Sequence, residues 1–161
     1  MGVARQLLMI GLALLLAGCA GRDTIPDIDS PTPRMVASVP GRFVGQEVLW
    51  GGVVLASENL EKSTLFEILA YPLDWRGGPD VTEASIGRFQ ALGEGYMETG
   101  DFPRGRALTL MGKVTEVRVG KVGEAEYLFP IVEIRKLWLW PPPGYIDRPR
   151  TRFGIGVGIR L

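Results

Sequence analysis

Apolar residues run in short blocks through the middle of the chain, and polar or glycine-containing segments separate the blocks. Residues 48–57 are almost continuously apolar, and residues 65–71 are likewise rich in types that favour β-structure. The polar residues 58–63 between the two blocks predict the turn of an antiparallel hairpin.

A long strand is predicted further along the chain. Leu108, Leu110 and Val114 alternate with polar residues around Gly112, which is typical of a half-buried strand that bends or bulges at the glycine. The apolar positions change parity at Val117, as expected where a long strand curls around a small barrel.

The remaining elements are shorter or less regular. Residues 120–123 predict a turn, and residues 127–140 predict a strand in which Pro130 marks an edge or a bulge. Between the two strand pairs, residues 87–95 predict a short strand and residues 80–86 one helical turn.

This succession predicts one mainly β domain over residues 42–140. Many short strands with long central connections favour a small, closed or partly open antiparallel barrel of about five to six strands, OB-like in type. A β-sandwich is the alternative. A chain of 161 residues has room for one such domain.

The N-terminal residues have the pattern of an export signal. Arg5 precedes an uncharged run at residues 7–17, which is too short to cross a bilayer as a permanent helix. Length and flanks therefore predict a secretory signal peptide over residues 1–18.

The end of this signal resembles the bacterial lipobox. Leu16, Ala17 and Gly18 precede Cys19, and the small residues permit cleavage before an acylated cysteine. The resemblance implies that Cys19 becomes the first mature residue and carries acyl chains, so a membrane is the expected partner through this lipid. Ala20 follows in place of an inner-membrane retention aspartate, which favours the outer membrane and a periplasm-facing domain.

A lipid-anchored, proline-rich tether is predicted over residues 19–41. Large apolar residues are scarce there, and Pro26, Pro31, Pro33 and Pro40 interrupt the segment. Proline fixes φ and donates no backbone hydrogen bond, so the tether should be an extended spacer of up to roughly 60 Å.

Composition narrows the chemistry. The chain has no histidine and a single cysteine, which removes the usual residues of a zinc site, a Ser-His relay or a Cys-His nucleophile. We expect no metal, no cofactor and no enzymatic activity. Eighteen basic and eighteen acidic residues cancel, so charge gives no case for nucleic acid as a partner.

Two sets of residues are candidates for contact with a ligand or partner. Arg88, Arg104 and Arg106 lie among glycines, and guanidinium groups grip carboxylates or phosphates in two-point fashion. These arginines favour a small-anion or lipid-headgroup site. The alternative is a structural role in which they pair with acids such as Asp74, Glu98 or Asp101.

The tryptophans form the second set. Trp50 and Trp138 lie within predicted strands and are expected in the core. Trp75 lies in a glycine-rich loop and Trp140 precedes three prolines, so these two are the candidates for an exposed contact, with packing under a loop as the alternative.

Residues 141–161 predict a proline-rich connection and a final glycine-rich strand. Apolar residues and glycines alternate strictly over residues 153–159, and arginines dominate the flanks. This strand either completes the domain's own sheet or pairs with a partner chain or anionic lipid.

Short motifs over residues 50–138 also occur in an order typical of one family. They are Trp50-Gly51-Gly52, Tyr71-Pro72-Leu73-Asp74, Gly87-Arg88-Phe89, Arg104-Gly105-Arg106 with Gly112, Gly123-Glu124, Tyr127 with Pro130, and Leu137-Trp138. With the lipobox, this ordered set resembles the Slp family, the starvation-inducible lipoproteins of the Gram-negative outer membrane. The resemblance implies location and a link to stationary phase and envelope stress, without an established reaction or catalytic residue.

Two functions are compatible with these observations. The first is a non-enzymatic envelope module that binds or stabilises an envelope component, either a protein or a lipid. The alternative is a carboxylate-dependent hydrolase of envelope glycans or lipids, which requires two acids such as Asp74 and Glu94 to converge in one cleft.

Overall fold

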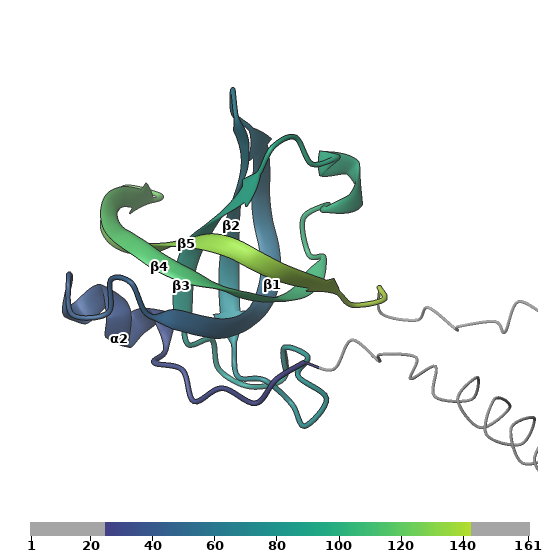
Figure 1. Ribbon diagram of the computed structural model, residues 1–161, viewed down its shortest axis with the longest axis horizontal. Helices are drawn as coiled ribbons and strands as arrows, with labels where there is room; N and C mark the ends of the chain where they lie inside the picture. Colours follow the sequence, from purple (N-terminus) through teal and green to yellow (C-terminus); the bar gives the residue numbers. More distant parts are fainter. Residues whose placement is uncertain (1–24, 143–161) are drawn as a thin grey trace, which may run out of the picture.

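Five strands close into a barrel in the computed structural model, which describes residues 25–142. The strands are β1 (Glu47–Asn59), β2 (Ser63–Tyr71), β3 (Gly87–Glu94), β4 (Ala107–Val122) and β5 (Ala125–Leu139). They follow the order β1-β2-β3-β5-β4 around the barrel, and β4 pairs again with β1 (Figure 1). Only β3 and β5 pair in parallel among these strands. The predicted closed, OB-like barrel is confirmed, and the sandwich is not.

Both predicted hairpins are present, and bulges explain the parity change in β4. A register shift between Val114 and Glu116 leaves Thr115 as an extra residue in β4. Beyond this bulge the odd-numbered Val117 packs against the core, whereas before it the even-numbered Val114 does. A second shift lies between Met111 and Gly112, beside the glycine at which the sequence predicted a bend or bulge, and it leaves Arg135 of β5 as the extra residue. Pro130 pairs with Val117 close to the first bulge.

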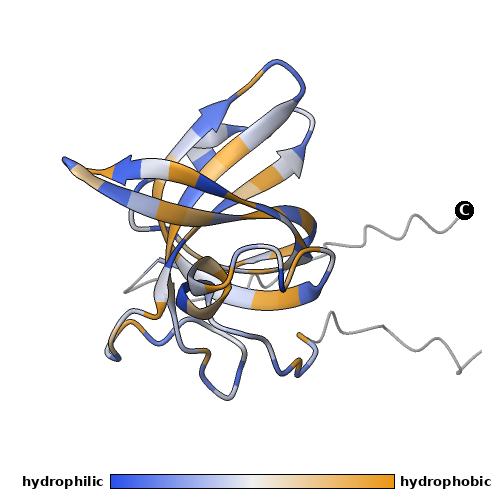
Figure 2. Cartoon of the chain, turned by 90° about the vertical axis from the view of Figure 1, so that its left-hand side faces the viewer, coloured by the Kyte–Doolittle hydropathy of each residue, from blue (hydrophilic) through white to orange (hydrophobic). Residues whose placement is uncertain are grey.

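The core lies inside the barrel and follows the period of two along the strands. Buried and partly exposed residues alternate without exception along β2. Figure 2 shows the matching bands of hydrophobic and hydrophilic residues. The largest side chains that are fully buried include three phenylalanines, Phe66, Phe89 and Phe129.

The proline-rich segment is not a free spacer in the part that the structure describes. Residues 25–32, here called the strap, run along one end of the barrel and lead into α2 (Pro33–Ser38) (Figure 1). Pro33 and Val36 are buried. Thr32 caps α2 by accepting a hydrogen bond from the Met35 backbone, and Pro33 occupies the first turn, where proline fits a helix.

The spacer expected over residues 19–41 is therefore corrected from Ile25 onward. Proline has no backbone N–H to donate, but its ring can pack and its carbonyl can accept a hydrogen bond. Here the Pro33 ring is buried, and the Pro31 carbonyl accepts from the Trp50 indole. The predicted reach of the tether shrinks accordingly, because only the residues before Ile25 remain to separate the barrel from an anchor.

The segments between β2 and β4 differ in part from the sequence predictions. Residues 80–86 form a turn and an irregular segment instead of a helical turn. The short 3-10 helix η1 (Thr99–Asp101) between β3 and β4 was not predicted. The signal peptide with its lipobox and the final strand at residues 153–159 lie outside the described residues. Within residues 25–142, no helix has the length and apolar character needed to cross a membrane.

Candidate functional site

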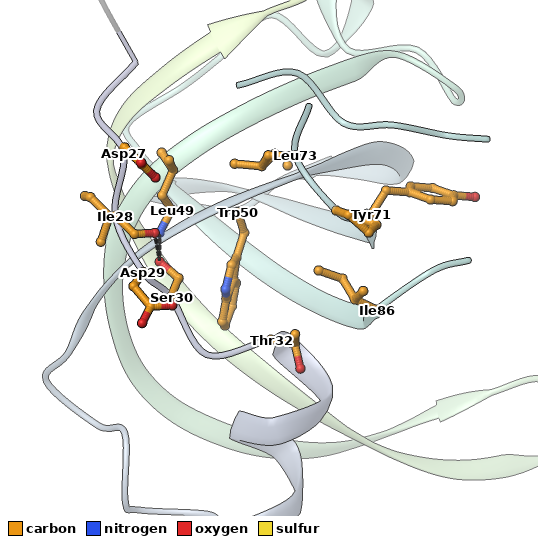
Figure 3. Close-up of a pocket in the computed structure, with 12 residues that line it drawn as sticks. Asp27, Ile28, Asp29, Ser30, Thr32, Leu49, Trp50, Tyr71, Leu73 and Ile86 are labelled. Atoms are coloured by element: carbon orange, nitrogen blue, oxygen red, sulfur yellow. Dashed lines mark hydrogen bonds between the residues drawn. The ribbon is translucent and has the colours of Figure 1, made fainter. Parts of the chain in front are cut away.

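A groove lies at the barrel end where the strap crosses. It consists of two adjoining hollows of about 440 and 430 Å³, which share Asp27, Leu49 and Leu73 among their lining residues. We call it the basal groove; its walls are the strap on one side and the loop of residues 72–80 on the other. Figure 3 shows Trp50 between the strap residues and the opposite wall of Tyr71, Leu73 and Ile86.

The strap wall is fixed to β1 by two hydrogen bonds. The Leu49 backbone donates to the Ser30 hydroxyl oxygen at 2.9 Å, and the Trp50 indole N–H donates to the Pro31 carbonyl at 2.7 Å. Trp50 is buried and meets Phe89 of the core edge-on, with 4.9 Å between ring centroids. Trp50 therefore connects the barrel core to the floor of the groove, and its predicted burial is confirmed.

The opposite wall, the 72–80 loop, is held by hydrogen bonds between its backbone and nearby side chains. Asp74 Oδ1 accepts from the backbone N–H groups of Arg76 and Gly78, both at 2.8 Å. The Thr109 hydroxyl donates to the Gly77 carbonyl at 2.6 Å, and the Trp140 indole N–H donates to Thr109 at 2.9 Å. A loop with this many fixed groups presents its outward side chains in a defined arrangement.

Arg76 lies between two indole rings on this loop. Its guanidinium carbon is 5.9 Å from the Trp75 ring centroid and 5.8 Å from that of Trp140, within the range of cation–π attraction. The Trp75 side chain is 92% exposed, whereas Trp140 is half-buried against Gly78. Of the two candidate tryptophans, Trp75 is free for contact and Trp140 packs under the loop.

Trp138 differs from its expected place in the core. It is only partly buried, lies outside the core cluster, and its indole nitrogen has no hydrogen-bond partner. The Lys136 ammonium group sits 5.1 Å from its ring centroid. Trp138 pairs with Thr109, whose hydroxyl donates to the 72–80 loop on the outer face of the barrel. Directly paired residues share a face of the sheet, so Trp138 also lies on the outer face.

The structure gives separate partners to two of the three candidate arginines. Arg88 forms an ion pair with Glu67 at 2.9 Å, and Arg104 donates to the Leu55 carbonyl at 3.1 Å. Arg88 lies on β3 and Arg106 directly precedes β4; around the closed barrel β5 lies between these two strands on one side, and β2 and β1 on the other.

Their partners also differ from those expected. The described ion pair of Arg88 is with Glu67, a diagonal neighbour on β2, instead of Asp74, Glu98 or Asp101. Asp74 and Glu98 accept backbone N–H groups in their own loops. The structural alternative therefore fits Arg88, and the anion site stays a prediction for the arginines together.

The carboxylates proposed for a hydrolase lie at opposite barrel ends. Glu94 pairs with Ser63 at the start of β2, while Asp74 follows the end of β2 at Tyr71. The intervening length of β2 is roughly 25 Å at about 3.3 Å per residue, so these two groups cannot act on one bond. The Asp74–Glu94 version of the hydrolase is wrong.

Asp80 also has a structural task. The Thr82 hydroxyl donates to its carboxylate at 2.6 Å and the Thr82 backbone N–H at 3.0 Å, and these bonds lower the pKa of Asp80. A general acid needs a raised pKa, so this carboxylate shapes a turn. Among the described residues, no cluster of three metal-ligating side chains occurs.

Sequence reasoning missed the strap wall of the groove. The sequence predicts a spacer for Asp27, Asp29 and Ser30, whereas in the structure these residues line the groove opposite Leu73. The Thr32-Pro33 pair was the available signal, since it is typical of a helix start and marks the point where the chain returns to the barrel.

Trp50→Phe tests whether the indole N–H holds the strap. We expect a loss of about 1–3 kcal/mol in the free energy of unfolding, from the lost hydrogen bond and the smaller ring. Amide hydrogen exchange at Leu49, which donates to the strap, should become faster. Trp140→Phe is the matched control, because its indole N–H serves the other wall and should leave Leu49 exchange unchanged.

Fold and groove place the chain in the class of small closed β-barrels that present a groove at one barrel end. The chain belongs to the outer membrane lipoprotein Slp family, whose model matches residues 16–154. The resemblance found in the sequence motifs is thereby confirmed. The family identifies the protein as an outer-membrane lipoprotein by type.

Individual relatives agree with this assignment. The chain is 36% identical over 145 residues to the uncharacterized lipoprotein YeaY of Escherichia coli, covering 86% of this chain and 73% of the relative. It is 28% identical over 164 residues to the outer membrane protein Slp of the same organism, covering 98% and 86%.

One solved structure gives a partial overlap. It is a small single-stranded DNA-binding protein from Streptomyces coelicolor, with a TM-score of 0.42, 13% identity, and coverage of 59% of this chain and 94% of the other. At this level of overlap the two barrels carry no common argument about ligand or function.

Proposed function

We propose that this protein is a non-enzymatic, lipid-anchored module of the outer membrane that binds or stabilises an envelope component through the basal groove. Acylation at Cys19 supplies the anchor, and the barrel faces the periplasm. The family resemblance further implies synthesis at starvation or in stationary phase, which an immunoblot through growth tests directly.

The observation that carries this proposal is the chemistry of the groove. Its floor is apolar, with Leu49, Leu73 and Trp50, and the carboxylates of Asp27 and Asp29 lie on the strap side. Such a lining suits a ligand with an apolar body, held in orientation by a few polar groups. The nearby acids Asp74 and Asp80 are occupied by hydrogen bonds within their own turns, which supports binding over acid–base catalysis.

Site-specific photo-crosslinking in intact cells tests this function. A photo-reactive amino acid replaces Asp29 at the groove, and in a matched chain replaces Tyr96, an exposed residue just after β3 at the other barrel end. We expect a defined adduct from position 29 that is absent from position 96. Identical adducts from both positions, or none from position 29, would contradict a groove that binds an envelope component.

A second measurement addresses catalysis. If the module only binds, the single replacements Asp27→Asn and Asp74→Asn should weaken the position-29 adduct by degrees, and neither these nor Asp29→Asn should change any release of product from envelopes. Purified lipidated protein that releases product from isolated envelopes, with the release lost in one of these variants, would favour a hydrolase instead.

A further inference from the structure

Trp75 is the most exposed of the large apolar side chains in the described part of the chain. It is 92% exposed, whereas at the same barrel end Trp140 is half-buried and Trp50 is buried. An exposed indole leaves a large apolar area in contact with water, and exposed aromatic side chains commonly mark a contact surface.

The loop that carries Trp75 is preorganised. Asp74 fixes the backbone on both sides of the tip, and the Thr109–Gly77 and Trp140–Thr109 hydrogen bonds tie the loop to β4. Because the loop is already ordered, a contact made by Trp75 costs little conformational entropy. Arg76, stacked beside the indole, adds a cation suited to phosphate oxygens.

The chain enters the described structure beside this same loop. Ile25 packs against Gly77, where a Cβ atom would lie 2.9 Å from Ile25 Cγ2. Cys19 precedes Ile25 by six residues, which span at most about 20 Å even when fully extended. An acyl anchor at Cys19 therefore keeps the 72–80 loop close to the bilayer.

From this placement we infer that the barrel end carrying the 72–80 loop faces the membrane, and that the Trp75 indole inserts into the interfacial layer of the lipid bilayer. The inference rests on the anchor of the proposed function and names the bilayer surface as a partner of that end of the barrel. Tryptophan rings favour the depth of the headgroups, where an apolar face and an indole N–H are both accommodated.

A short anchor also makes a weak contact effective. The second contact of a molecule that is already held by a short linker is intramolecular, with an effective concentration on the order of millimolar. The carboxylates of Asp27 and Asp29 lie near the same groove, so attraction to anionic lipid is not the main force. Insertion of Trp75 should therefore depend little on salt.

Quenching by brominated lipid tests the orientation. The lipidated full-length protein is placed in phosphatidylcholine vesicles with or without bromine on the acyl chains. The Trp75 signal is the difference between the wild-type protein and Trp75→Phe. The matched control combines Trp75→Phe with Tyr96→Trp, which moves the exposed indole to a site that is 73% exposed at the opposite end.

We expect bromolipid to quench the Trp75 signal at least about threefold more than the indole at position 96, consistent with a depth of roughly 5–10 Å into the interface. Equal quenching at the two positions in a protein that floats with the vesicles overturns the orientation and leaves the anchor intact. A wild-type protein that does not float overturns both. Loss of the quenching at high salt would show that electrostatic attraction, and not insertion of the indole, holds this end at the membrane. That result would overturn the inference.

Discussion

Phe89→Ala should lower the free energy of unfolding by about 3–5 kcal/mol, the largest stability effect expected from one substitution in this barrel. Phe89 is fully buried and lies on β3, which both the antiparallel β2 and the parallel β5 flank. Truncation removes its apolar area and leaves a cavity that the closed sheet cannot collapse to fill.

The same substitution should loosen the groove. Phe89 supports Trp50 edge-on, and Trp50 in turn holds the strap through the Pro31 carbonyl. Urea unfolding followed by circular dichroism measures the loss of stability, and Leu49 amide exchange reports on the strap. Tyr96→Ala is the control, since this exposed ring should contribute less than about 0.5 kcal/mol. A similar loss in both variants would mean that Phe89 is not part of the barrel core.

Cys19→Ala should release the protein from the membrane. Each buried methylene contributes about 0.8 kcal/mol to the free energy of membrane binding. Two or more acyl chains therefore make an anchor that stays bound throughout an experiment. Without the sulfur no such chain can be attached, and within residues 25–142 no helix is long and apolar enough to cross a membrane. We expect less than about a tenth of the cleaved, unlipidated protein to float with vesicles, against nearly all of the wild-type protein.

Processing has to be separated from anchoring in that experiment, because loss of the cysteine also removes the lipobox. Mass spectrometry of the N-terminus shows whether the signal has been cleaved. A second chain, exported by a signal peptide of the non-lipoprotein type and starting at Ala20, gives the cleaved, unlipidated state directly. Membrane retention of this second chain would show that the barrel binds the envelope without its lipid.

The groove lies at the barrel end where the described chain begins at Ile25. The anchor proposed at Cys19 would therefore hold this end of the barrel, with the strap as one wall of the groove, close to the bilayer. Envelope components that lie at the membrane surface are for this reason better candidates than those deep in the periplasm.

Local sequence determined the strands of this protein. Residues 48–57, 65–71 and 108–119 carry their own period and β-forming types, and these depend on neighbours only a few positions away. Gly112 likewise indicated a bend or bulge before any pairing was known, and the parity change at Val117 indicated a strand that curls around a small barrel. The barrel followed because short strands with one apolar face have few ways to bury it.

Contacts between distant segments were decided only by the tertiary structure. The strap carries no strand or helix pattern before Thr32, and the carbonyl of Pro31 became an acceptor only because Trp50 was brought to it. Arg88 found Glu67 through the β2–β3 register, and Asp74 and Glu94 were separated by that same register. Pairing between strands fixes which side chains meet, and a composition or a spacing along one chain does not contain that information.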